Sequence, residues 1–448
     1  MHLLSRLLTR SLSPMPELRR RTCSTTPSNE GDRFRLTRSR SILRSGAVVV
    51  FFVFTVLALS GWEIANAQSA SQVIQYDPSD SILGDPILVE DGRAGLMALY
   101  DMRFEAADSI FARIESQYVG HPIGPFLKAL VIWWRILPGL EMGPTADDDR
   151  FYDAMEIVIR RSDEMLDADE DNFDAMFFKG AALGFRGRLR SNRQEWLSAA
   201  LDGRAALDYI FKIADADTTN ADFQFGRGVY DYFASVIPER YPIVKPMMIF
   251  FPDAEKERGL KNITYTAEKG QFIQTEAVYF LLQIYLNYER DFDGARKQVE
   301  WLRARHPRNA FFHVLEGRVF ATWYRWDQAV EVFQEVIDLY ERGATGYGDL
   351  IASQAEYYIG RFDMLAGRSD DALTRFDRVI DLSKTIPADT YFKLFATLRR
   401  GMIYDTRGER SSAILEYEKV LDMKDLGGAH ERAKRYRKVP YAGAVGSS

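Results

Sequence analysis

Two short acidic segments carry oxygen ligands at alternate positions, as calcium-binding loops do. They are DADEDNFD at 167–174 and DADTTNAD at 215–222. A calcium loop of the helix–loop–helix type also needs a glycine at position 6 and a glutamate at position 12, and both segments lack them. Asp and Asn side chains also accept hydrogen bonds from the first backbone N–H groups of a helix. We therefore predict helix starts at both segments and no metal site.

The other residues that commonly perform chemistry are few and scattered. The only cysteine is Cys23, and the histidines after residue 67 are His121, His306, His313 and His430. None of them has the spacing of a zinc motif. The sequence also lacks a G-x-S-x-G nucleophile motif and a Walker phosphate loop. We therefore predict that the protein is not an enzyme and has no cofactor.

A basic run, GFRGRLRSNR, contains Arg186, Arg188, Arg190 and Arg193. These arginines could bind an acidic peptide or a lipid head group. They could instead lie at the solvated C-terminal end of a helix, where cations interact favourably with the helix dipole. We prefer the second interpretation, because helix ends of this kind commonly carry cations.

The charge distribution argues against nucleic acid as a partner. Residues 1–67 contain ten arginines and four acidic residues, a net charge of +6, whereas the whole chain has −6. The remainder therefore holds 48 basic and 60 acidic residues, a net charge of −12. Because a nucleic acid backbone needs a basic surface, we expect a protein or peptide partner.

The elements that position these residues are helices, since helical periodicity covers the chain from about residue 88 and strand signals are almost absent. A repeated spacing of small residues divides this region. Asn309 is followed by Gly317 after eight residues, by Ala329 after twelve more and by Phe333 after four more. The same glycine–alanine–aromatic spacing recurs as Gly95, Ala107 and Phe111, as Gly360, Ala372 and Phe376, and as Gly401, Ala413 and Tyr417.

This pattern resembles the tetratricopeptide repeat (TPR), a 34-residue pair of antiparallel helices. The resemblance covers about residues 88–423. It implies an all-α solenoid of about eight antiparallel helix pairs, wound into a right-handed superhelix. We expect the small residues Gly317 and Ala329 to face each other where the two helices of a pair cross. Without side-chain bulk there, the helix axes approach to the lower end of roughly 8–10 Å.

In TPR proteins the first helices of the pairs line a concave groove that binds a partner. Positions three before, one after, and four or five after the small residue usually face it. Aromatic side chains there provide apolar pockets, and arginines bind carboxylates. The resemblance assigns these residues to a partner-binding groove: Phe225, Val229, Tyr232, Phe280, Asn287, Tyr288, Val314, Arg318, Tyr357, Arg361 and Met364.

The first 67 residues have the features of a targeting segment. A basic arm precedes the uncharged run GAVVVFFVFTVLAL at 46–59, and ANAQSA then offers small residues for cleavage after Ala67. The run is shorter than the ~20 residues of a spanning helix. We therefore predict a signal peptide and export to the periplasm or cell envelope, as in an exported bacterial TPR protein. An uncleaved inner-membrane anchor in this segment is the alternative, and would be the only membrane contact.

We divide the rest of the chain by its regularity. A linker covers 68–87, irregular repeats cover 88–270, regular repeats cover 271–423, and a flexible tail covers 424–448. Insertions interrupt the irregular repeats at 137–149 and at 237–252. The second insertion has four prolines, which exclude a regular helix, while its apolar residues favour burial. We expect the second helix of the third pair at about 193–213.

These observations predict a non-catalytic scaffold or adaptor that binds a protein or peptide in its groove. One alternative is a membrane-tethered assembly factor of the cell envelope. The other is an enzyme whose site lies within 137–252.

Overall fold

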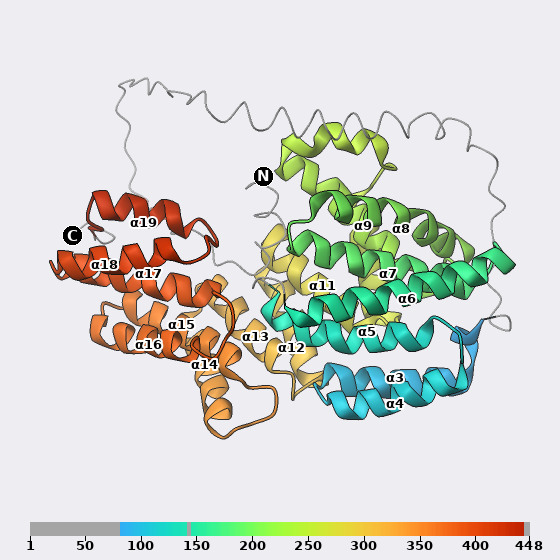
Figure 1. Ribbon diagram of the computed structural model, residues 1–448, viewed down its shortest axis with the longest axis horizontal. Helices are drawn as coiled ribbons and strands as arrows, with labels where there is room; N and C mark the ends of the chain where they lie inside the picture. Colours follow the sequence, from blue (N-terminus) through green and yellow to red (C-terminus); the bar gives the residue numbers. More distant parts are fainter. Residues whose placement is uncertain (1–80, 141–144, 443–448) are drawn as a thin grey trace.

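The computed structural model describes residues 81–140 and 145–442 of the chain (Figure 1). Within these residues all regular structure is helical, and consecutive helices pack as eight pairs followed by one further helix. The predicted all-α solenoid of helix pairs is therefore confirmed. The helices are α3 (Pro86–Tyr100), α4 (Phe104–Gln117), α5 (Ile123–Ile136), α6 (Ala146–Ala168), α7 (Phe173–Asn192), α8 (Trp196–Ala216), α9 (Ala221–Arg240), α10 (Lys256–Lys269), α11 (Gln274–Ile284), α12 (Phe292–Arg305), α13 (Ala310–Thr322), α14 (Trp326–Glu341), α15 (Asp349–Leu365), α16 (Ser369–Leu382), α17 (Tyr391–Thr406), α18 (Arg410–Asp422) and α19 (Ala429–Lys438). The shorter elements are η2 (Ile82–Gly84), η3 (Leu137–Gly139), η4 (Pro242–Phe250) and the π-helical turn η5 (Tyr285–Glu289).

The acidic segments begin helices, as predicted. The side-chain oxygen of Asn172 accepts a hydrogen bond from Ala175 N at 2.9 Å, and that of Asn220 accepts one from Asp222 N at 3.0 Å. These bonds satisfy backbone donors that have no partner within the first turn of a helix.

The repeated glycine makes room for an aromatic ring. A Cβ atom on Gly317 would lie 2.6 Å from the Phe333 ring, and one on Gly401 would lie 2.6 Å from the Tyr417 ring. Gly95 faces the Phe111 ring, and Gly360 faces the Phe376 ring, in the same way. The predicted contact between the glycine and the alanine of the second helix stays a prediction, because the atoms nearest to the glycine belong to an aromatic ring. The glycine faces the aromatic residue four positions after that alanine.

Leucine in place of Gly317 should destabilise the fold by about 1–3 kcal/mol, because the buried Phe333 ring must move to admit the new side chain. Urea unfolding of the two proteins measures the difference. Gly203→Leu is the matched control, since a Cβ on Gly203 meets nothing within 4 Å. Equal losses of stability in the two variants would contradict this explanation of the repeat.

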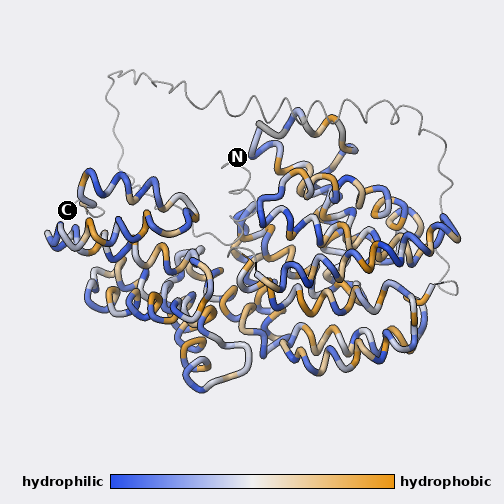
Figure 2. The backbone as a smooth tube through the Cα atoms, in the orientation of Figure 1, coloured by the Kyte–Doolittle hydropathy of each residue, from blue (hydrophilic) through white to orange (hydrophobic). Residues whose placement is uncertain are grey.

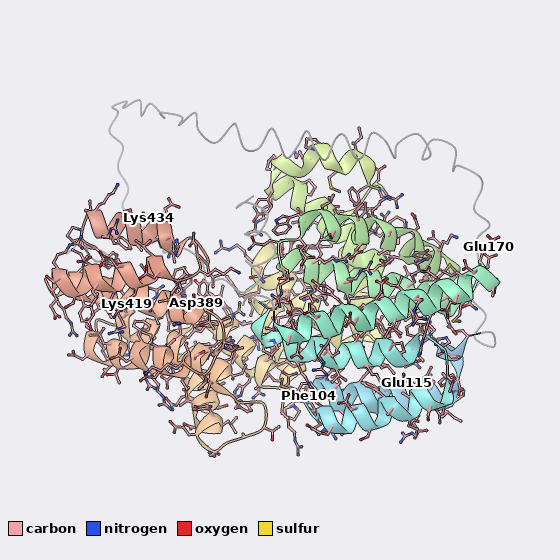
Figure 3. All side chains as sticks on the ribbon, in the orientation of Figure 1. Phe104, Glu115, Glu170, Asp389, Lys419 and Lys434 are labelled. Carbon is pink, nitrogen blue, oxygen red and sulfur yellow. The ribbon has the colours of Figure 1, made fainter. Side chains whose placement is uncertain are left out.

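Hydrophilic and hydrophobic residues alternate along many of the helices in Figure 2, whereas α13 is buried on nearly all sides. The buried apolar side chains form two large cores. The first core joins α3 to the helices up to α13, and the second extends from α13 to α19. Phe104, labelled in Figure 3, packs against both cores at the junction between them.

The solenoid closes on itself, because the first pair meets the segment around α13. Asn309 Nδ2 donates a hydrogen bond to Tyr100 O at 2.7 Å, and the two residues are 209 positions apart. The Trp134 ring of α5 lies 5.5 Å from the Phe312 ring of α13. In Figure 1 the ends of α3 and α5 accordingly lie beside α12 and α13. The helices from α3 to α12 therefore enclose a space.

The C-terminal end is more ordered than the sequence predicted. Residues 429–438 form α19, and Ala429 and Ala433 on it are fully buried against α17 and α18. Arg410 also donates hydrogen bonds to the carbonyl oxygens of Tyr436 and Arg437. The prediction of a flexible tail is therefore wrong for α19, which covers the last pair of the solenoid.

The insertion at 237–252 differs from its prediction. Helix α9 continues through Pro238 to Arg240, and η4 follows it. Pro242, Lys245, Pro246 and Ile249 are exposed, and Ile249 has 81% of its surface accessible. The prediction that the apolar residues of this insertion are buried is therefore wrong for Pro242, Pro246 and Ile249. These residues are exposed because η4 projects from the end of α9 (Figure 1).

The remaining boundaries agree or differ by a few residues. The second helix of the third pair is α8, close to the predicted position. The predicted linker ends earlier than residue 87, because Ile82 N already donates to Asp174 Oδ2 at 2.9 Å. The predicted targeting segment lies outside the described residues. No helix in the described part of the chain is long and apolar enough to span a membrane.

Candidate binding sites

A cavity of about 550 Å³ lies inside the closed part of the solenoid. Helices α3, α5, α7, α8, α9 and α11 enclose it, and we call it the inner cavity. Its volume falls in the roughly 300–1,000 Å³ of ligand pockets. Most of its lining is aliphatic or aromatic, including Leu96, Phe126, Leu130, Phe185, Ile210 and Phe233.

Four residues that the sequence assigned to a groove line this cavity. They are Phe225, Val229, Phe280 and Tyr288. The sequence predicted an open concave face, and the structure places these half-buried side chains around a partly open cavity. The difference arises because α3 and α5 close over the space that a short run of repeats leaves open.

Four other predicted groove residues are buried. Tyr232, Val314 and Tyr357 have at most 1% of their surface exposed, and Arg318 has 4%. The prediction that they face a partner groove is therefore wrong. These helices bury aromatic and branched side chains on several faces, since they pack between neighbours on both sides. Asn287 is half-buried and donates to Gln283 Oε1 at 3.0 Å.

A cation lies among the aromatic rings of the inner cavity. The Arg188 guanidinium is 4.9 Å from the centre of the Trp133 ring, 5.0 Å from that of Phe280 and 5.8 Å from that of Tyr279. Such contacts stabilise a cation through the negative faces of the rings. Among residues 81–140 and 145–442, no carboxylate forms an ion pair with Arg188 within 4.0 Å.

The neighbouring arginines of the basic run bind acidic residues. Arg186 and Arg190 both pair with Asp202, at 2.7 and 2.6 Å, and Arg193 pairs with Asp148. Asp202 and Asp148 are buried. The preferred interpretation of a solvated helix end is therefore wrong, because α8 and α6 bring these carboxylates against α7.

Polar side chains on one face of α11 also line the inner cavity. Glu276, Tyr279 and Gln283 are three and four positions apart, so they lie on the same side of the helix. Trp134 Nε1 donates to Glu276 Oε1 at 3.2 Å. Burial raises the pKa of Glu276, although Arg188 and the Trp134 bond act in the opposite direction.

Gln283 has an unused hydrogen-bond donor. Its Nε2 has no hydrogen-bond partner among the described residues, although only 7% of the residue surface is exposed. The other polar groups of the lining include Asp222, whose carboxylate accepts from the backbone N–H groups of Gln271, Phe272 and Ile273 at 3.0–3.1 Å. Asp222 is thus already used in holding the start of α11.

A second candidate site lies along the turns within consecutive pairs of the regular half. The Phe292 ring stacks on that of Trp323 at 6.1 Å, and the Trp326 ring stacks on that of Phe362 at 6.2 Å. These contacts join the turns of three successive pairs. We call this surface the turn edge; it comprises Arg290, Phe292, Trp323, Tyr324, Arg325, Trp326, Arg361, Phe362, Met364 and Leu365.

The turn edge combines aromatic residues with arginines. Arg325 lies 5.0 Å from the Trp323 ring centre, and Arg361 lies 5.2 Å from that of Trp326. Tyr324 and Leu365 remain 52% and 59% exposed. Trp, Tyr and Arg are the residues enriched at protein–protein hot spots. Two predicted groove residues, Arg361 and Met364, therefore belong to this surface.

No cluster of three or more His, Cys, Asp or Glu side chains suited to a metal ion occurs in the part of the chain that the structure describes.

Comparisons with known proteins give only distant similarities. No family model matches the sequence, and no curated protein matches it. The solved structures that are similar to this chain include the following three. Yeast Tom70 has a TM-score of 0.39 and 11% identity, and the match covers 81% of this chain and 83% of that chain. Naa15/Naa10 bound to HypK-THB has a TM-score of 0.27 and 13% identity, covering 80% and 75%. The APC/C hetero-tetramer Cut9–Hcn1 has a TM-score of 0.22 and 10% identity, covering 77% and 89%.

Proposed function

We propose that the protein is a non-catalytic helical-repeat scaffold that binds an acidic segment of a protein partner along the turn edge. The observation that carries this proposal is the two aromatic stacks, Phe292 on Trp323 and Trp326 on Phe362, which link three pairs. Tyr324 and Leu365 are exposed next to them in the sequence. Exposed apolar side chains next to Trp and Arg supply both the area and the geometry that a partner's side chains need.

The charge of the turn edge indicates the kind of partner. Arg290, Arg325 and Arg361 form no ion pair with a carboxylate in residues 81–140 and 145–442. The chain after residue 67 is nevertheless acidic, with a net charge of −12. Three uncompensated arginines on an acidic protein attract a carboxylate-rich partner selectively, since like charges elsewhere on the surface repel it.

The proposal predicts that Tyr324→Ala combined with Leu365→Ser reduces partner binding about tenfold or more, because both exposed apolar contacts are lost. We would immobilise the full chain, retain partners from a cell-envelope extract, identify them by mass spectrometry, and compare their affinities for the variant. Binding should also weaken with added salt, since exposed arginines contribute.

Leu415→Ser is the matched control, because Leu415 is 54% exposed on α18 and lies outside the turn edge. Arg361→Glu is a suitable charge reversal, since Arg361 is only half-buried. Arg318→Glu is unsuitable, because Arg318 is buried and the change would disturb the fold. Equal retention of a partner by the double variant and by the control would refute the turn edge as the binding surface.

A further inference from the structure

We propose that the inner cavity binds a long-chain fatty acid, with its carboxylate beside Arg188 and Gln283 and its acyl chain among the apolar side chains of α3, α5 and α9. This proposal concerns a different site from the turn edge and is independent of the function proposed above.

The size of the cavity indicates an occupant. The cavity measures about 550 Å³ and is partly open to solvent, since Gly184 in its lining is exposed. Its aliphatic and aromatic lining lacks dispersion contacts on the cavity side. Water is a poor filling for such a space, since it needs polar partners that most of this lining does not offer. A flexible hydrocarbon chain restores these contacts.

The distribution of polar groups favours an acyl chain over a peptide. Each peptide residue brings a backbone donor and acceptor, and burying them unpaired costs free energy. The polar side chains that the cavity could offer gather on α7 and α11, where Arg188, Glu276, Tyr279 and Gln283 lie. Helices α3 and α5 contribute almost only apolar side chains. A molecule with one polar end and a long apolar body matches this division.

The polar end offers donors for a carboxylate. Arg188 lacks a paired carboxylate among the described residues, and Gln283 Nε2 lacks a hydrogen-bond partner there. Tyr279 and Phe280, which contact Arg188, lie one helical turn before Gln283 on α11. The two donors therefore converge on the same end of the cavity. A carboxylate has two acceptor oxygens, and hydrogen bonds from a guanidinium to it are strong.

Glu276 is the acidic side chain that faces Arg188 from α11. Its Oε1 already accepts the Trp134 hydrogen bond. Burial is the largest influence on Glu276 and raises its pKa, which favours the neutral carboxylic acid. Glu276 makes no ion pair with Arg188 within 4.0 Å among the described residues, so the guanidinium remains available to a ligand carboxylate.

The test uses the full chain, freed of bound lipid and titrated with palmitate, with the corresponding alcohol and with the methyl ester. We expect palmitate to bind about tenfold or more tightly than the two neutral compounds, because only palmitate pairs with Arg188. Arg188→Met should remove this preference by weakening palmitate about tenfold while leaving the alcohol unchanged.

A second pair of variants fills the cavity without disturbing the fold. Gly184 on α7 and Gly203 on α8 line the cavity, and a Cβ on either meets nothing within 4 Å. Gly184→Leu and Gly203→Leu should therefore abolish palmitate binding, with a thermal midpoint no lower than that of the parent protein. Gly348→Leu is the control, since Gly348 also has open space but lies outside the cavity.

Three results would overturn the proposal. One is failure of the parent protein to bind palmitate. Another is equal affinity for palmitate and the alcohol, with no effect of Arg188→Met. The third is binding of an apolar helical peptide, but not of palmitate, that Gly184→Leu blocks, since the cavity would then be a peptide site.

Discussion

Replacing Gly259 with leucine should destabilise the protein by about 3 kcal/mol or more, at or above the upper end of typical overpacking effects. Helices α9 and α10 approach each other backbone to backbone at this glycine. A Cβ on Gly259 would lie 2.8 Å from Gly228 O and 2.9 Å from Tyr232 Cα, and would also collide with Tyr232 N. A ring such as that of Phe333 can turn aside for a new side chain, whereas a helix backbone cannot. The whole of α10 would have to move.

Urea unfolding provides the measurement, and a series of variants separates the clash from the general effect of replacing glycine in a helix. Gly259→Ala should already destabilise, because the Cβ atom itself collides. Gly184→Ala should instead stabilise by up to about 1 kcal/mol, since alanine favours helix and that site has open space. If Gly259→Ala and Gly184→Ala change stability in the same direction, close backbone packing at α9 and α10 is not the reason for this glycine.

The regular pairs could be predicted because their spacing is set by contacts within a pair. Gly317 and Phe333 are sixteen residues apart, and the same interval separates Gly401 from Tyr417. Two adjacent helices and one turn fix that interval, so it appears in the sequence as a repeat. The contact partner of the glycine could not be predicted in the same way. The alanine and the aromatic residue lie one helical turn apart, and the structure shows that the aromatic ring lies nearest to the glycine.

The inner cavity could not be predicted, because its closure depends on distant residues. The bond between Asn309 and Tyr100 joins segments 209 positions apart, and no repeat motif encodes it. The sequence nevertheless contains one signal of the inner cavity. Glu276 and Gln283 occur on a helix otherwise rich in apolar residues, and their separation of seven places them on one face. Polar residues on an inward face of a repeat helix indicate a polar end to the enclosed space.

The turn edge was also missed, for a different reason. The sequence WYRW at 323–326 is rich in aromatic residues, but so is the rest of the repeat region. Its position between two helices is the informative feature, because turn residues lie on the surface of a solenoid. Aromatic side chains at a surface turn need a neighbour, and here they find it in the turns of adjacent pairs.

Acidification from neutral pH to about pH 5 should destabilise the protein well before most carboxylates are protonated. His306 and His313 are each only 1% exposed. Burial lowers the pKa of His306 to about 4 and that of His313 to about 3, with nearby Arg305 and Arg303 adding to the effect. Both histidines are therefore neutral in the folded protein at pH values where an unfolded chain binds a proton at each.

The contacts of each ring are consistent with a neutral imidazole. His306 Nε2 lies 3.0 Å from Thr275 Oγ1, and His313 Nδ1 lies 3.0 Å from Tyr347 Oη. The Glu335 carboxylate lies 3.4 Å from His313 Nε2. That carboxylate favours the charged ring, but Glu335 is 67% exposed and so is screened by solvent.

The direction of the change in stability with pH follows from proton uptake. Below the ordinary histidine pKa of 6.5 the unfolded chain binds more protons than the folded protein, so stability falls as the pH decreases. Each histidine contributes a slope of up to about 1.4 kcal/mol per pH unit, which integrates to about 1.6 kcal/mol between pH 6.5 and about pH 5. The loss continues to the folded pKa values of about 4 and about 3 and then stops.

Urea unfolding at several pH values tests whether the two histidines cause this loss of stability. We would compare the parent protein with the His306→Gln, His313→Gln double variant. The glutamine side chain forms hydrogen bonds but does not titrate, so the double variant should keep nearly constant stability between pH 6.5 and about pH 5. The parent should lose about 3 kcal/mol over the same interval, twice the contribution of one histidine. Parallel pH profiles of the two proteins would show that other groups titrate. Because carboxylates occur in both proteins, their protonation cancels in the comparison and only the two buried rings remain.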